Sequence, residues 1–290
     1  MAHQDAQQEF NGLPPGEMSV RFWGVRGSIA CPGPETVRYG GNTSCLEVWC
    51  GERMLILDGG TGLRELGRDI MRRGQKLDAD LFYSHTHFDH ICGLPFFAPC
   101  FVPGYVIRMW AGHLLPENTL ENVLCGMMMA PLFPVPMGML NADVAFNDFR
   151  CGETLTPRPG IVLRTAPLNH PNGATGYRIE YAGKVLTYIT DTEHRPGQLD
   201  QNVLTLADRA DLLIYDSTYT DEEYPSHVDW GHSTWQEGVR LADAAKVKKL
   251  VIFHHDPGHD DTFMDRIAVD AERARPGGAV VAREGMVLQL

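Results

Sequence analysis

The chain has 290 residues, a formal net charge of −12 at pH 7 and 43% hydrophobic residues. This length fits one large or two small domains with a sizeable core. The acidic balance argues against tRNA as a partner, because a polyanion is usually bound by a basic surface. No apolar run approaches the roughly 18 residues that span a bilayer, so the sequence predicts no membrane segment.

The first residues of the chain, 1–17, are polar, contain the run Pro14-Pro15-Gly16 and lack the apolar stretch of a secretory signal. We expect them to form a disordered tail, followed by a single domain over residues 18–290. The seven cysteines are odd in number and form no CxxC pair, which argues against a disulfide framework. This cysteine usage indicates a protein of the reducing cytoplasm.

Continuous or alternating apolar runs predict a series of strands. Residues 182–184 predict a hairpin turn. Helical spacing follows the glycine-rich loop 58–62, and it recurs at 234–245, with Ser233 as N-cap, and at 261–274. The predicted strands, in chain order, cover residues 20–23, 45–50, 54–57, 81–84, 106–110, 161–166, 175–181, 185–189, 212–215, 250–253, 279–282 and 286–290.

Residues 112–138 differ from the rest of the chain. They contain a possible helix around 120–129, a run of three methionines and, after it, Pro131, Pro134 and Pro136. One interpretation is an ordinary connection with a buried methionine face, since methionine adapts to irregular gaps. The other is a lid beside a binding pocket, or a contact in a possible homodimer.

The most informative stretch is Ser-His-Thr-His-Phe-Asp-His at residues 84–90, directly after the predicted strand 81–84. It places three imidazoles and a carboxylate within six consecutive positions. Neutral imidazole nitrogen and carboxylate oxygen are the ligands that Zn²⁺, Mn²⁺ or Fe²⁺ prefer. The sequence therefore predicts a metal site at the end of this strand.

The pattern HxHxDH is the signature of the metallo-β-lactamase superfamily, and the chain resembles a member of it. The resemblance extends to a later His, Asp and His in the family's order: His170, Asp191 and the first of the pair His254-His255. It implies an α/β fold, an αββα sandwich of two mixed sheets flanked by helices, with metals at one sheet edge. Neighbouring residues of a strand point to opposite sides, and alignment of the preceding apolar run favours His254 over His255 as the ligand.

The same resemblance implies two divalent metal ions, zinc being favoured and manganese or iron remaining open. Asp58 would support a ligand from behind or would act only as a turn former. Carried over residue by residue, one ion is held by His85, His87 and His170, the other by Asp89, His90 and His254, and Asp191 bridges them.

The segment Gly231-His232-Ser233-Thr234 resembles a motif of the ribonuclease Z and cyclic-nucleotide phosphodiesterase branch. There a His contacts the scissile phosphate and protonates the leaving oxygen, a role that suits His232. Ser233 and Thr234 would add hydroxyl and backbone donors for phosphate oxygens. The alternative is that Ser233 only caps the helix and that His232 is exposed.

Two further stretches point to the same branch. One is Asp216-Ser217-Thr218-Tyr219, and the other is the N-terminal segment around Arg26, which is expected to meet a phosphate or to be an ordinary turn residue. The catalytic residues implied are Asp89, Asp191 and His232.

Three functions from different classes remain open. The favoured one is a dinuclear phosphodiesterase acting on a small, cyclic nucleotide, because neither a basic surface nor a long Gly/Lys-rich arm for tRNA is found in the sequence. The first alternative is a hydrolase of a lactone or β-lactam. The second is a nucleotide-binding effector that keeps a metal site.

Overall fold

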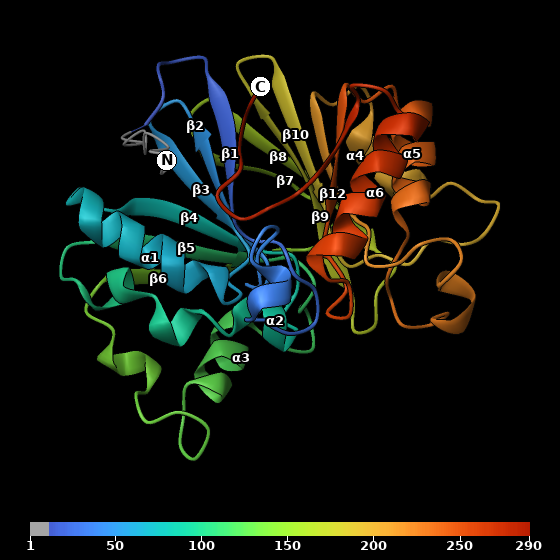
Figure 1. Ribbon diagram of the computed structural model, residues 1–290. Coiled ribbons are helices and arrows are strands. Elements are labelled where there is room, and N and C mark those ends of the chain that lie inside the picture. Colours follow the sequence, from blue (N-terminus) through green and yellow to red (C-terminus); the bar gives the residue numbers. More distant parts are fainter. Residues whose placement is uncertain (1–11) are drawn as a thin grey trace, which may run out of the picture.

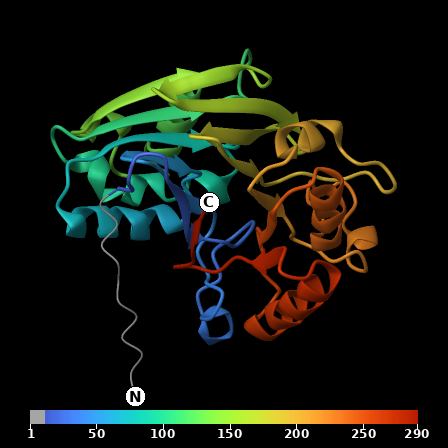
Figure 2. The same ribbon diagram turned by 90° about the horizontal axis from the view of Figure 1, so that it is seen from above.

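The computed structural model describes residues 12–290, which form two seven-stranded mixed sheets packed face to face with helices on both outer surfaces (Figures 1 and 2). The predicted αββα sandwich is confirmed. A cluster of buried apolar side chains, among them Phe22, Leu57, Tyr188 and Phe253, fills the space between the sheets.

The first sheet has the strand order β14-β1-β2-β3-β4-β5-β6. Pairing is antiparallel from β14 to β3 and parallel from β3 to β6. The strands are β1 (Met18–Gly24), β2 (Cys45–Cys50), β3 (Arg53–Leu57), β4 (Asp78–Tyr83), β5 (Val106–Ala111), β6 (Asp143–Asp148) and β14 (Val287–Gln289).

The second sheet has the order β13-β12-β11-β10-β9-β8-β7, parallel from β13 to β10 and antiparallel from β10 to β7. The predicted hairpin turn joins β9 to β10, and both Ala182 and Gly183 have positive φ, as a tight hairpin requires. The strands are β7 (Thr154–Arg158), β8 (Ile161–Leu168), β9 (Ala174–Tyr181), β10 (Lys184–Ile189), β11 (Leu212–Asp216), β12 (Lys249–Phe253) and β13 (Ala279–Val281).

Helices cover the outer face of each sheet (Figure 1). On the first sheet lie α1 (Gly62–Arg73), α2 (Phe88–Ile91) and α3 (Leu120–Met127); on the second lie α4 (Gln201–Ala207), α5 (Trp235–Ala244) and α6 (Asp261–Ala274). Short 3₁₀ turns occur at Pro34–Thr36, Leu94–Phe96, Ala98–Phe101, Met137–Met139 and Tyr224–Ser226.

Some elements differ from the predictions. Four elements were not predicted: strands β6 and β7 and helices α2 and α4. The two strands are the outer strands of their sheets and have no continuous apolar run. Helix α5 is capped by Thr234, whose side chain accepts a hydrogen bond from the Glu237 amide, so the prediction of Ser233 as N-cap is wrong.

The expected tail, residues 1–17, falls partly outside the described residues, which start at residue 12. Leu13 does not behave as part of a loose tail. It is buried in the core of the first sheet, and its amide donates to the Gly51 carbonyl at 3.0 Å. Ordered structure therefore extends ahead of β1.

Residues 112–138 are anchored through α3, because Leu124 and Met128 are buried against the first sheet. Met129 and Leu132 are 53% and 75% exposed. The segment thus has both a buried methionine and an exposed apolar face. Its role as a lid or dimer contact stays a prediction.

No helix among residues 12–290 is long and apolar enough to cross a membrane. All seven cysteines are unpaired within this range, in keeping with the expectation of free thiols.

Candidate metal centre

The seven predicted ligands converge at one edge of the sandwich, where strands of both sheets end. The 84–90 motif follows β4 of the first sheet, and the later ligands follow β8, β10 and β12 of the second. Because β8, β10 and β12 run in the same direction, their carboxyl ends meet at the same edge. Two groups form there: His85, His87 and His170; and Asp89, His90, Asp191 and His254, with the ligand atoms of each group within 4.8 Å of one another.

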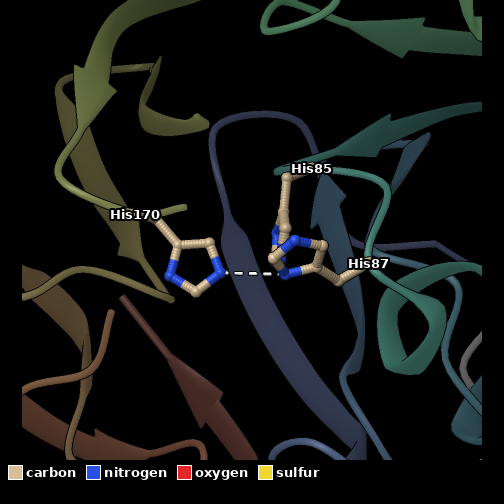
Figure 3. Close-up of side chains that lie close together, drawn as sticks. All are labelled: His85, His87 and His170. Carbon is tan, nitrogen blue, oxygen red and sulfur yellow. Dashed lines mark hydrogen bonds between the residues drawn. The ribbon is translucent and has the colours of Figure 1, made fainter. Parts of the chain in front are cut away.

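The first group consists of three imidazoles that point toward one another (Figure 3). Their ring centroids lie 4.5 to 4.8 Å apart. His170 Nε2 is 3.0 Å from His87 Nδ1, while its Nδ1 faces away and donates to the Gly231 carbonyl at 2.7 Å. That backbone bond fixes the tautomer of His170 and leaves Nε2 with a lone pair for a cation.

Asp191 stands between the two groups. Its Oδ1 lies 3.8 Å from Nε2 of both His85 and His170 in the first group. Its Oδ2 lies 3.1 Å from His90 Nε2 and 3.2 Å from His254 Nε2 in the second. One carboxylate oxygen thus faces each group, which is the geometry that a bridging ligand requires.

The two neighbouring histidines after β12 point in different directions. His254 has a left-handed backbone, with φ of 63°, and its Nε2 faces both Asp191 and Asp89. His255 Nε2 instead bonds to the Ala282 carbonyl at 2.8 Å, away from the cluster. The structure therefore brings His254, and not His255, into the ligand cluster.

Asp58 supports the second group from behind. It is fully buried at the end of β3, with φ of 60°. Its Oδ2 accepts from His90 Nδ1 at 2.9 Å, Ser84 Oγ at 2.8 Å and the Tyr188 hydroxyl at 2.7 Å. A carboxylate in this position orients a ligating imidazole and raises its basicity.

The electrostatics of the cluster suit metal binding. Burial and the neighbouring His90 hold the pKa of His85 well below its usual value, so this imidazole is neutral. Burial favours protonation of Asp191, but His254 and His90 outweigh it and keep its pKa well below the ordinary value. Burial lowers the pKa of His90, but the carboxylates of Asp89, Asp191 and Asp58 outweigh it and hold that pKa well above the usual value, so a cation bound at His90 would displace its proton. A neutral imidazole such as that of His85 and an ionised carboxylate such as that of Asp191 are the forms that bind a divalent cation.

Buried histidine nitrogens without a hydrogen-bond partner show whether the cluster is suited to a metal ion. The Nε2 atoms of His85, His90 and His254 are buried and make no hydrogen bond of acceptable geometry within the described residues. Leaving three such atoms unpaired is costly in a protein interior. Cations would satisfy all three, so the residues fit a metal site.

His232 lies at the border of the two groups formed by the predicted ligands: a ring nitrogen of it is within 4.8 Å of His170 and Asp191 on one side and of Asp216 and His254 on the other. It is 8% exposed, and its ring centroid is 5.4 Å from that of His170. Its Nδ1 is 3.0 Å from Asp216 Oδ2. Burial lowers the pKa of this imidazole, but the carboxylates of Asp216, Asp191 and Asp89 outweigh burial and raise it to about 9. In the absence of a bound cation, His232 is therefore protonated at neutral pH.

Asp216 is the residue that sequence reasoning missed. Its segment was noticed as typical of the phosphodiesterase branch, but no role was given to the carboxylate. It ends β11 and also accepts from the Thr192 amide at 3.0 Å and the Thr218 hydroxyl at 2.8 Å. The sequence could have indicated this role, because Asp216 ends an apolar strand that lies between Asp191 and His254 in the chain, where the predicted ligands also follow strands.

Three expected phosphate contacts are not supported. Ser233 Oγ bonds to His194 and Tyr215, and Thr234 Oγ1 bonds to Asp221 while it caps α5. Arg26 is fully buried and donates to backbone carbonyls. The polar groups of these three residues are therefore engaged in hydrogen bonds within the protein rather than directed at a phosphate.

Glu193 ties the loop that carries His232 to the metal cluster. One of its carboxylate oxygens accepts from the Asp229 amide at 2.8 Å and from the Tyr224 hydroxyl at 3.1 Å. The other accepts from the Gly231 amide at 2.8 Å. Since the Gly231 carbonyl fixes His170, this buried carboxylate positions a ligand as well as the loop.

Comparison with known proteins agrees with this geometry. A family model described as a β-lactamase superfamily domain matches residues 53–255. The chain belongs to the β-lactamase superfamily. With its histidine and aspartate cluster at the sheet edge, this superfamily member is a metal-dependent hydrolase.

Relatives of this superfamily member include Ribonuclease Z of Lactobacillus gasseri, 29% identical over 232 residues that cover 60% of this chain and 69% of that protein. The metallo-β-lactamase-fold protein YhfI from Bacillus subtilis has a TM-score of 0.70 at 18% identity, covering 94% of this chain and 99% of that one. A diphosphatase of the PhnP family has a TM-score of 0.67 at 20% identity, covering 94% and 97%. These two structures share the fold.

Proposed function

We propose that the protein is a metal-dependent phosphodiesterase that acts on a small nucleotide. The observation that carries the proposal is the pair of His232 and Asp216 beside the metal-ligand cluster. Phosphodiester cleavage expels an alkoxide, which needs a proton as it departs. A protonated imidazole next to the cluster supplies that proton.

In this proposal the cluster holds two divalent ions, with zinc as the first choice and manganese or iron as alternatives. When bound, the ions supply positive charge for phosphate oxygens and lower the pKa of an attacking water. The residues that would hold them are His85, His87, Asp89, His90, His170, Asp191 and His254.

His232 acts as the proton donor. Its Nδ1 is held by Asp216, which leaves Nε2 for the substrate. The Asp216 carboxylate orients the ring and stabilises the imidazolium, as a carboxylate does in other histidine-based sites. Burial of the ring keeps bulk water away from the proton that it transfers.

The charge of the protein favours a small substrate. A net charge of −12 would repel a long polyanion, whereas one phosphodiester can be drawn in by the local positive charge of a loaded site. The Ribonuclease Z relatives support phosphodiester chemistry and make a short RNA end the second candidate.

The test compares His232→Ala with wild type on two substrates. With a ribose 3′-oxygen leaving group, kcat should fall by roughly 10²–10⁴-fold, the usual contribution of general acid catalysis. With bis-p-nitrophenyl phosphate, whose leaving group needs little protonation, the loss should be far smaller. Elemental analysis should find the metal content unchanged.

His227→Ala is the matched control, since it removes another imidazole from the same loop and should leave both rates near wild type. Equal losses on both substrates in His232→Ala would reduce its role to binding. Wild-type cleavage of nitrocefin or a lactone, but of neither phosphodiester, would overturn the proposal.

A further inference from the structure

A cleft adjoins the metal centre, since the candidate ligand His170 is among its lining residues. Its volume is about 410 Å³, within the range of small-molecule sites. Its lining includes His170 and Pro171 after β8, Arg195 after β10, and Val228 and Asp229 from the loop that precedes His232. A group bound in the cleft would therefore lie next to a phosphate held at the metal centre.

Arg195 contributes to the lining of the cleft a positively charged side chain that has no ionic partner among the described residues. Within residues 12–290 its guanidinium makes no hydrogen bond or ion pair, although the protein is strongly acidic. By contrast, Arg240 on α5 is paired with both Asp221 and Glu237. A free guanidinium binds a phosphate with two parallel hydrogen bonds, which makes phosphate its natural ligand.

The other lining groups suit the rest of a nucleotide. Asp229 adds an exposed carboxylate, the group that accepts hydrogen bonds from the hydroxyls of a ribose in dinucleotide sites. Pro171 and Val228 give apolar walls against which a base can lie. The buried Glu193 also lines the cleft, but its oxygens are already occupied by two amides and the Tyr224 hydroxyl.

We propose that this cleft is a subsite for a nucleoside bearing a terminal phosphate, on the leaving-group side of the scissile bond. Arg195 binds the terminal phosphate and Asp229 the ribose hydroxyl. The substrate class is then a short 5′-phosphorylated oligonucleotide, such as a dinucleotide. Gly231 lines the cleft and immediately precedes His232, so the leaving oxygen would lie near the proposed proton donor. This inference rests on the proposed phosphodiesterase function.

The experiment measures kcat/KM for the dinucleotides pApA and ApA, which differ only in the 5′-phosphate. Wild type should prefer pApA by about tenfold or more, the effect of one charge-assisted phosphate contact. Arg195→Ala should bring the ratio close to one, and Arg195→Lys should retain part of it. Arg273→Ala on α6 removes another exposed arginine, far along the chain from the cleft, and should keep the wild-type ratio.

A second variant tests the ribose contact. Asp229 has φ of 70°, a conformation that asparagine also tolerates, so Asp229→Asn should keep the loop intact. It should lose the preference of wild type for pApA over its 2′-deoxy counterpart. The variant should leave the ratio of pApA to ApA above one.

The outcomes separate the subsite from the function. If wild type cleaves bis-p-nitrophenyl phosphate but shows no preference for pApA, the subsite is wrong and the phosphodiesterase proposal stands. A preference that survives Arg195→Ala also overturns the subsite. Failure to cleave any phosphodiester in the metal-loaded protein overturns the function instead.

Discussion

Three residues at the metal centre have a positive φ, a backbone conformation that residues other than glycine rarely adopt. Asp58, Asp191 and His254 have φ of 60°, 52° and 63°; Asp58 and His254 directly follow the ends of β3 and β12, and Asp191 comes shortly after the end of β10. Such conformations cost of order 1–3 kcal/mol and persist where the surroundings enforce them. Here the positive φ turns the side chains of Asp191 and His254 toward the cluster and that of Asp58 toward His90. The strained backbone therefore lies at the residues whose side chains build the site.

Asp216 also acts at the scale of a single residue, through the pKa of His232. Asp216→Asn removes the carboxylate that contributes most to raising this pKa above its usual value, so the pKa should fall. The acid form of His232 would then be lost at lower pH, and the alkaline limb of the kcat profile should move toward lower pH. Rates on a substrate with a ribose 3′-oxygen leaving group, measured from pH 6 to 10, check this shift. Asp208→Asn is an exposed control, and an unmoved alkaline limb in Asp216→Asn would contradict the role of the pair.

At the scale of elements, the site depends on one loop held against two strand ends. The loop of residues 224–232 carries His232 and the Gly231 carbonyl that fixes His170. Glu193 holds this loop through its carboxylate, and its backbone pairs with Asn169 beside His170. One buried side chain therefore couples the proposed proton donor to a candidate metal ligand.

Glu193→Gln should loosen that coupling. The new amide NH₂ cannot accept from the loop amides, so the Gly231 carbonyl would no longer hold His170 in place. Changes of this kind behind a ligand typically weaken metal binding by about 10–100-fold. Titration of metal into chelator-treated protein measures the effect, with Glu222→Gln as an exposed neighbouring control. If metal affinity is unchanged in Glu193→Gln, Glu193 stabilises the loop but does not position His170 for metal binding.

At the scale of the whole molecule, the metal cluster lies where the two sheets meet and draws ligands from both. Chelation should therefore destabilise the entire fold, because ions that bind only the folded state stabilise it by about 2.7 kcal/mol at one hundred times Kd. For a domain of this size that corresponds to a melting temperature lowered by roughly 4–5 °C. Calorimetry with and without chelator, followed by zinc or manganese addition, checks it. Asp191→Ala should respond much less, and equal melting temperatures in wild type would contradict the metal site.

Features that depend on adjacent residues could be predicted from the amino-acid sequence. The apolar runs before the 84–90 motif, Asp191 and His254 gave both the strands and the ligands at their ends, because strand and turn chemistry depends on adjacent residues. Helix α6 was predicted with its observed bounds for the same reason. The outer strands β6 and β7 were missed, since a strand with few buried neighbours has little apolar pattern to detect.

Contacts between segments far apart in the chain could not be predicted, because they depend on how the two sheets and their loops pack. The Asp216 carboxylate meets His232 because β11 ends where the 224–232 loop returns. The burial of Arg26 and the free guanidinium of Arg195 are equally invisible in the sequence, where both are single arginines in loops. Packing sets which polar groups are paired and which remain available, and that depends on the whole fold rather than on neighbouring residues.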